Sequence, residues 1–167
     1  MRFTDDDFPT LSSVDQLDVL EDLLSLPPLL SLDITQHAQY LSKTLDQSLS
    51  RHFVSLDASR PWIIYWILHA LDLLNIQITE SQKTRAIHTL ASFQHAQGGF
   101  GGGPGQIPHL APTFASVHAL AILGSSEAFE IIHVPNMIAF LSRLKDPDGS
   151  FRMHQEGEVD VRFVLTF

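Results

Sequence analysis

The feature that most constrains the fold of this chain is an internal repeat of about 50 residues. The segment Leu90–Phe100, LASFQHAQGGF, aligns with Leu141–Phe151, LSRLKDPDGSF, 51 positions further on. Each segment places a helix end, a glycine turn and a phenylalanine in the same order, and new apolar helices follow near Pro112 and Asp160. The helix at Arg60 occupies the equivalent place one unit earlier. Two helices per unit predict an αα repeat array, in which no unit buries its apolar face alone.

Helical periodicity runs through nearly the whole chain, and no alternating strand of useful length interrupts it. We therefore expect an all-α fold. The helix opened by Pro61 is apolar on almost every side, which predicts that it is buried all round. The expected helices are one capped by Ser13 and ended by Pro27–Pro28, one over about 35–53, one opened by Pro61, one over about 80–95, one opened by Pro112 and stopped at Gly124, and one opened by Pro135 and ended by the Asp146–Gly149 turn.

The distribution of charge divides the chain into two regions. Residues 1–33 hold eight acids and one base, whereas residues 34–167 hold eleven acids and nine bases. We expect residues 1–33 to be an acidic N-terminal extension and residues 34–167 to be the repeat domain. The net charge of −9 argues against a nucleic-acid surface, which is basic. We expect a cytoplasmic protein, because the sequence shows neither a secretory signal nor an apolar run long enough to span a bilayer.

The content of cysteine and histidine bears on catalysis and metal binding. The chain has no cysteine, which excludes disulfides, thiolate metal ligands and a cysteine nucleophile within it. Its nine histidines are scattered, and neither the pair His88 and His95 nor the pair His109 and His118 has a glutamate at metalloprotease spacing. We therefore predict no catalytic residue and no metal ligand within this chain.

Four aromatic side chains share one face of the helix opened by Pro61. Trp62, Tyr65, Trp66 and His69 stand at positions i, i+3, i+4 and i+7. Such a stripe is either core packing or the wall of a cavity for a long apolar ligand, since ligand pockets are mostly aromatic and aliphatic. The sequence alone leaves both interpretations open.

Two further features also have two interpretations. The glycine-rich loop Gly98–Gly105 lacks the spacing of a dinucleotide or phosphate loop, so its glycines serve either tight turns around Phe100 or the close approach of a ligand or partner. Arg162 stands in an otherwise apolar run, and a buried arginine requires an anionic partner. That partner is either a carboxylate of the protein or a bound carboxylate or phosphate.

Three blocks of sequence carry a resemblance to a known family. They resemble the β subunits of protein farnesyltransferases, and a weaker match extends the similarity over roughly residues 35–162. The glycine-rich block distinguishes this branch from the geranylgeranyltransferase relatives. The blocks are LDASRPWIIYWILHALDLL at Leu56–Leu74, QGGFGGGPGQIPHLAPTFASVHALAILG at Gln97–Gly124 and PDGSFRMHQEGEVDVR at Pro147–Arg162, with the weaker HAQYLSKTL at His37–Leu45.

The resemblance implies an α-α toroid with a central funnel, paired with a helical α subunit. In that family the enzyme joins a farnesyl group from farnesyl diphosphate to the cysteine of a C-terminal CaaX sequence. Zinc lowers the pKa of the cysteine thiol, and magnesium offsets charge on the diphosphate. By position, the resemblance implies that Trp62 and Trp66 line the pocket for the isoprenoid and a CaaX side chain. It also implies that His109 and Ala111 lie near the CaaX peptide and that Arg162 faces the funnel near both.

The sequence departs from the family after Arg162, where it reads FVLTF up to Phe167. The zinc ligands and the diphosphate-binding cluster belong to the later repeats of the family, so we expect a truncated, partial toroid that is inactive alone. Three alternatives stay open. The chain is a complete autonomous domain, a non-catalytic protein that binds the α subunit or another helical partner through an open edge, or a fragment without a stable fold.

Overall fold

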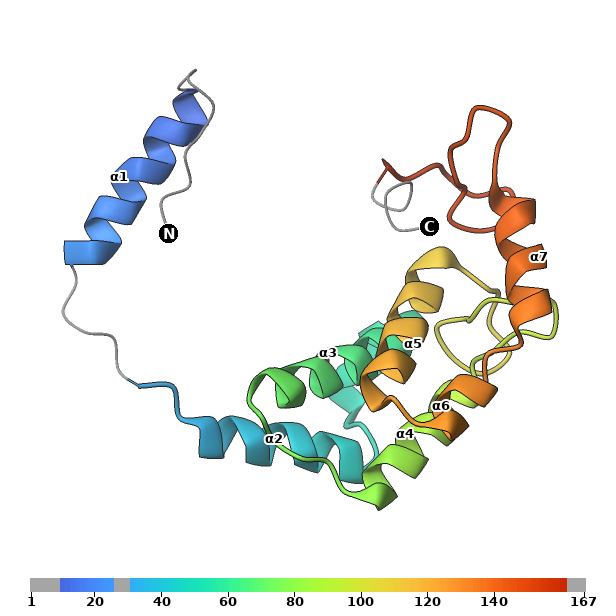
Figure 1. Cartoon of the computed structure of the whole chain (residues 1–167), viewed down its shortest axis with the longest axis horizontal. Helices are drawn as coiled ribbons and strands as arrows, with labels where there is room; N and C mark the ends of the chain where they lie inside the picture. The colour runs from blue at the N-terminus through green and yellow to red at the C-terminus, as the bar shows by residue number, and fades with distance from the viewer. Residues whose placement is uncertain (1–9, 26–30, 162–167) are drawn as a thin grey trace. The chain divides into compact units, whose positions relative to one another are not determined.

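The computed structural model describes residues 10–25 and 31–161 (Figure 1). The chain divides into two compact units, Met1–Asp33 and Ile34–Phe167. The described residues form seven α-helices and one 3₁₀ segment, with three isolated β-bridges and no named strand. The prediction of an all-α fold is confirmed. That residues 1–33 act as an extension to a repeat domain stays a prediction.

The first unit contains helix α1, Leu11–Ser25. Its cap differs from the prediction, because Thr10 rather than Ser13 precedes the helix. The two residues cap each other: the Thr10 amide donates to Ser13 Oγ at 2.8 Å, and the Ser13 amide donates to Thr10 Oγ1 at 3.2 Å. The proline pair predicted to end this helix lies outside the described residues.

The second unit carries the remaining helices, and several boundaries differ from the prediction. The helix expected over 35–53 ends at Asp46, and a separate 3₁₀ segment with a kink at Leu56 follows. The helix expected to reach 95 ends at Ala91, where the chain turns into a β-bridge. The short helix α6 was not predicted. The elements are α2 (Ile34–Asp46), η1 (Arg51–Ser59), α3 (Arg60–Leu73), α4 (Glu80–Ala91), α5 (Leu110–Leu123), α6 (Ser126–Glu130) and α7 (Val134–Leu144).

The predicted repeat is confirmed at the level of individual backbone contacts. Antiparallel bridges join Gln94 to Phe100 and, 51 positions later, Lys145 to Phe151. Three backbone hydrogen bonds recur with the same shift. Gly101 N donates to Phe93 O as Arg152 N does to Leu144 O (both 2.9 Å), and His95 N donates to Gly99 O (2.9 Å) as Asp146 N does to Ser150 O (2.8 Å). Gly98 N donates to His95 O as Gly149 N does to Asp146 O (both 2.9 Å). The aligned glycines of the two repeat turns both have a positive φ, 96° at Gly98 and 90° at Gly149.

Helices α3 and α5 lie side by side, with α2 against α3 and α4 against α5 (Figure 1). The two hairpins α2–α3 and α4–α5 therefore form neighbouring units of the array. Core side chains such as Leu68 on α3 and Leu120 on α5 are almost fully buried. The prediction that α3 is buried all round is wrong, because Trp66 is 52% exposed and Leu73 is 73% exposed. One face of α3 packs into the core, and the opposite face is partly exposed among the described residues.

The glycine-rich loop packs backbone against backbone. A Cβ placed on Gly102 would stand 2.0 Å from the carbonyl oxygen of Ala58, and Gly102 O accepts a hydrogen bond from Arg60 N at 3.2 Å. This backbone contact satisfies an amide at the start of α3, where Ser59 makes no side-chain cap. Phe100 is 0% exposed within the core. These contacts agree with the interpretation of the loop as tight turns around Phe100.

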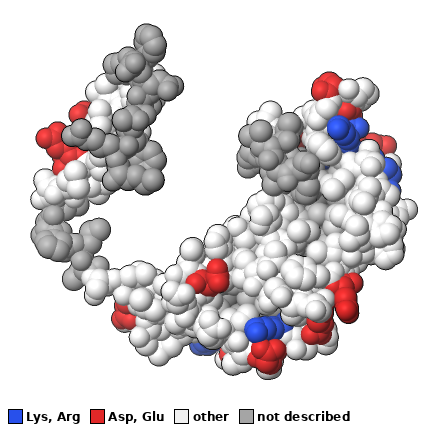
Figure 2. Space-filling model, viewed as in Figure 1, with Lys and Arg blue, Asp and Glu red and all other residues white. Residues whose placement is uncertain are grey.

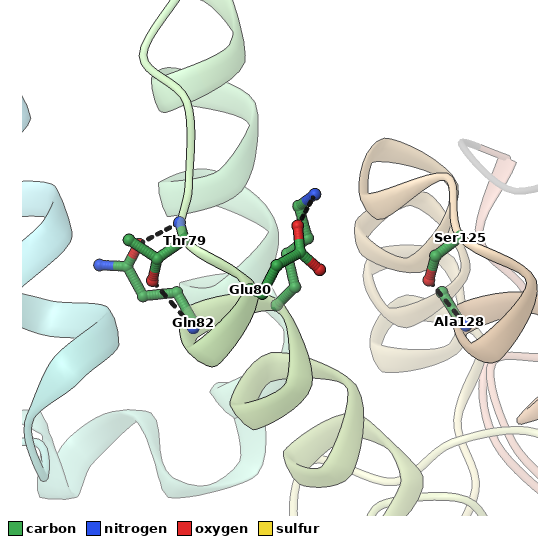
Figure 3. Close-up of polar contacts among 6 residues, drawn as sticks. Thr79, Glu80, Gln82, Ser125 and Ala128 are labelled. Carbon is green, nitrogen blue, oxygen red and sulfur yellow. Dashed lines mark hydrogen bonds and ion pairs between the residues drawn. The ribbon is translucent and has the colours of Figure 1, made fainter.

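Side-chain caps fix the starts of α4 and α6 (Figure 3). Thr79 Oγ1 accepts from the Gln82 amide at 3.2 Å, and Gln82 Oε1 accepts from the Thr79 amide at 2.9 Å, which forms a capping box. Gln82 Nε2 also donates to Asp46 Oδ1 at 3.0 Å, so this cap joins α4 to the end of α2. On α6, Ser125 Oγ accepts from the Ala128 amide at 3.2 Å.

Candidate ligand-binding site

Six ring side chains from two helices form one continuous surface, which we call the aromatic strip. Helical spacing places each set on one face of its helix, opposite the face that enters the core. On α5, Ala111 shares this face with the two rings, three residues before the first. The aromatic strip consists of Trp62, Tyr65, Trp66 and His69 from α3 and Phe114 and His118 from α5.

The packing of α3 on α5 brings the rings into contact. The Trp62 ring centroid lies 5.7 Å from the centroids of both Trp66 and Phe114. Tyr65 lies 6.1 Å from Phe114 and 5.9 Å from His118, and the rings of Phe114 and His118 are 4.1 Å apart. Most of these separations fall in the range of favourable aromatic pairs. The strip is therefore held together by contacts across the helix–helix interface as well as along each helix.

The aromatic strip lies at the surface of the described residues. Trp62, Tyr65 and Phe114 are half-buried, and Trp66 and His118 are exposed. In the view of Figure 2, charged side chains are sparse over the described surface of the Ile34–Phe167 unit. A contiguous exposed apolar surface of this kind is typical of a ligand or partner site. Of the two interpretations of the stripe, the structure rules out complete burial in the core of the described residues.

His109 and Ala111 stand at the start of α5, just before Phe114. His109 is the N-cap residue, and its Nδ1 accepts a hydrogen bond from the Ala111 amide at 3.1 Å. The ring of His154 lies 5.5 Å from the His109 ring. Burial lowers the pKa of His109 below its usual value of about 6.5, His154 lowers it further, and Glu158 acts in the opposite direction. This environment favours the neutral form of the His109 imidazole.

The remaining predicted site residue, Arg162, lies outside the described residues. Phe114 and His118 were missed by the sequence analysis, although their spacing on one helix face was visible. That signal could not show that α5 lies against α3 with its rings beside Trp62 and Tyr65.

A hollow among the described residues lies elsewhere, on the opposite side of α3. It has a volume of about 1040 Å³ and a floor that includes Ile63 and Ile67. Its two arginines already have partners, since Arg60 pairs with Asp57 and Arg85 Nη1 donates to the carbonyl oxygen of Asp46 at 3.2 Å. None of the six rings lines this hollow, so we place the candidate site at the aromatic strip.

The described residues bear on metal binding through the arrangement of their histidine and carboxylate side chains. No group of three or more histidine, aspartate or glutamate side chains among residues 10–25 and 31–161 is arranged to hold a metal ion. Together with the lack of cysteine in the sequence, these residues do not fit a zinc site.

The comparisons with known proteins agree with this architecture. The family model of the prenyltransferase alpha-alpha toroid domain matches residues 32–167. The chain belongs to this family. The prenyltransferase toroid family builds its domain from helical repeats, which accounts for the 51-residue recurrence of turns and bridges.

The prenyltransferase relatives include several protein farnesyltransferase beta subunits. The chain is 50% identical over 127 residues to that of Arabidopsis thaliana, covering 76% of this chain and 26% of the relative. It is 40% identical over 134 residues to that of Schizosaccharomyces pombe, covering 80% and 35%. It is 33% identical over 158 residues to that of Saccharomyces cerevisiae, covering 93% and 36%. The resemblance found in the sequence is thus confirmed, and the chain spans between about a quarter and a third of these relatives.

Within residues 10–25 and 31–161, every helix is too short or too polar to cross a bilayer.

Proposed function

We propose that this chain forms part of the β subunit of a protein farnesyltransferase. Such an enzyme transfers the farnesyl group of farnesyl diphosphate to the cysteine of a C-terminal CaaX sequence, in the cytoplasm and as a heterodimer with a helical α subunit. The observation that carries the proposal is the aromatic strip, a surface-exposed apolar wall in a chain similar to farnesyltransferase beta subunits. A fifteen-carbon isoprenoid offers the flexible apolar surface that aromatic rings bind well.

The role we assign to the described residues is binding and orientation. Trp62 and Trp66 would contact the isoprenoid and a side chain of the CaaX peptide, while His109 and Ala111 would lie beside the peptide. Arg162 would face the same funnel and pair with an anionic group. Rings that bury the isoprenoid also exclude water from it, which strengthens nearby polar contacts.

We propose zinc and magnesium as cofactors of the whole enzyme and not as ions bound by this chain. The described residues offer no fitting ligand set, so we assign no step at the thiol or the diphosphate to this chain. We accordingly expect the purified 167-residue chain to show no CaaX-dependent turnover, with or without an α subunit. Turnover by this chain would refute that expectation.

The binding role is tested with the two tryptophans, which are the only ones in the sequence. Titration of the chain with farnesyl diphosphate should change tryptophan fluorescence with saturation, whereas inorganic diphosphate should not. By calorimetry, Trp62→Ala should weaken farnesyl diphosphate binding by about tenfold or more, a loss typical of a buried aromatic contact. Phe129→Ala is the matched control, because Phe129 is 51% exposed, like Trp66, but lies on α6 away from the strip. Equal affinity of the wild type and Trp62→Ala would contradict the proposal.

A second candidate function is that of a non-catalytic chain that binds the α subunit or another helical partner. The observation in its favour is the exposed apolar edge of α7, where Val134 and Ile138 are 55% and 60% exposed. Purification of a stable complex with an α subunit that binds no farnesyl diphosphate would favour this candidate over the first.

A further inference from the structure

The start of α5 depends on a histidine in an unusual role. N-cap residues are normally Ser, Thr, Asp or Asn, whose oxygen accepts an amide hydrogen bond from the first turn. Here the acceptor is Nδ1 of His109, which receives the Ala111 amide at 3.1 Å. A ring nitrogen can accept this bond only through its lone pair, so Nδ1 must carry no proton. The proton of the neutral ring therefore sits on Nε2.

The backbone around His109 joins three segments of the second unit. The His109 amide donates to Phe100 O at 3.1 Å, and Thr113 Oγ1 donates to His109 O at 2.7 Å. The next amide, that of Leu110, donates to Met153 O at 2.7 Å. The glycine-rich loop, the first turn of α5 and the loop after Phe151 thus meet at this residue.

Several titratable or charged groups surround the His109 imidazole. From the loop that follows Phe151, His154 stacks at 5.5 Å between ring centroids and Glu158 acts electrostatically. His154 also lines a hollow of about 220 Å³ together with His95 and the α7 residue Arg143, and His109 itself does not line it. Burial and the neighbouring His154 disfavour a charge on the His109 ring, and a positive charge at a helix N-terminus is itself unfavourable. The surroundings therefore favour a neutral His109.

We propose that His109 is a proton-sensitive N-cap, whose neutral imidazole fixes the first turn of α5 and whose protonation releases it. A proton on Nδ1 turns the acceptor into a donor that faces the Ala111 amide, so the cap is lost and two N–H groups oppose each other. The released turn lies directly before Phe114, which contacts Trp62 and Tyr65 in the aromatic strip. Acid thus loosens the α5 side of the strip. This inference does not depend on which ligand the strip binds.

The sign of the pH effect follows from the pKa of His109. Because the folded-state pKa is lowered, the unfolded chain binds a proton at this position more readily than the folded chain does. Stability supplied by the neutral cap is therefore complete above about pH 6.5 and is lost as the pH falls through the lower, folded-state pKa.

The experiment uses the 167-residue chain and the variant His109→Asn. The Oδ1 of asparagine accepts the same amide bond but does not titrate, so the cap is kept while the proton sensitivity is removed. At about pH 8 the wild type and His109→Asn should unfold at similar temperatures, and at about pH 5 the variant should unfold about 3 °C or more above the wild type. His109→Ala should be less stable than His109→Asn at both pH values. Identical pH profiles for wild type and His109→Asn would overturn the proposal.

His133 provides a matched control, because its Nδ1 accepts the Asn136 amide at 3.2 Å as the N-cap of α7 and it is exposed. Because the cap at His133 is exposed, water can bond an amide that loses it, so His133→Asn should change the pH profile less than His109→Asn does. A change as large as that of His109→Asn would count against a special role of the buried junction. NMR gives a direct measurement on the wild type. The Ala111 amide resonance should titrate with the His109 ring and lose that titration in His109→Asn. If the Ala111 amide resonance does not shift while the His109 ring titrates, the cap mechanism is refuted.

Discussion

Replacement of Phe100 by alanine tests both the core and the repeat. Phe100 is 0% exposed, its amide donates to Thr113 Oγ1 at 2.9 Å, and its ring lies in the main cluster of buried side chains. Removing a fully buried phenylalanine loses its transfer free energy and leaves a cavity, which together cost about 3–5 kcal/mol. Domains of ordinary stability have only about 5–15 kcal/mol in total, so Phe100→Ala should move the urea midpoint far toward lower concentration.

The next repeat supplies the matched control for this change. Phe151 occupies the same position 51 residues later and closes an equivalent bridge, with Lys145 instead of Gln94, but it is only half-buried. Because part of the residue already meets water, Phe151→Ala should cost less, about 2 kcal/mol. The free energy of unfolding would be measured by urea titration followed by circular dichroism. Equal costs for the two variants would refute the argument that burial, rather than repeat position, sets the energy.

Two further predictions concern single atoms in the packed interior. Ser116 is fully buried in α5, and its hydroxyl has no hydrogen-bond partner among the described residues. Ser116→Ala should therefore raise the free energy of unfolding, measured by thermal unfolding, by up to about 1 kcal/mol. A clear loss of stability would show that the hydroxyl is bonded. Gly102→Ala should cost about 2 kcal/mol or more, because its Cβ would meet Ala58 O at 2.0 Å. Gly105→Ala should cost only about 1–2 kcal/mol, because no atom lies within 4 Å of its Cβ and only its φ of 72° is unfavourable. Gly105→Ala as harmful as Gly102→Ala would contradict the close-contact explanation.

The repeat could be predicted from sequence because its signals are local. A glycine with positive φ, a helix end before it and a phenylalanine after it fall within eleven residues of each repeat segment, and the same backbone bonds follow from the same spacing. Helix starts were harder to predict. Proline is favoured in the first turn of a helix rather than at one fixed position. Pro112 is therefore the third residue of α5, whereas Pro61 and Pro135 are the second residues of α3 and α7.

The candidate site was predictable in part. The shared face of Trp62 and Trp66 follows from helical spacing alone. The contribution of Phe114 depends on the packing of α5 against α3, which is a tertiary contact between residues about 50 positions apart, and no local pattern reports it. The cap at His109 was missed for a different reason. Histidine is not among the usual N-cap residues, so only the distance between Nδ1 and the Ala111 amide identifies its role.

The core and the candidate site are made by the same helix contact. The buried face of α5 includes Ala115, Ser116 and Ala119, whose small side chains allow a neighbouring helix to approach closely. That approach places Phe114 at 5.7 Å from Trp62, so the rings of the strip stay in contact only while α3 and α5 remain packed. A substitution that separates the two helices should therefore disturb the aromatic strip even when it lies on the opposite, buried face. Loss of stability and loss of ligand binding should accordingly occur together for core variants of α5, whereas Trp62→Ala should reduce binding with a smaller loss of stability.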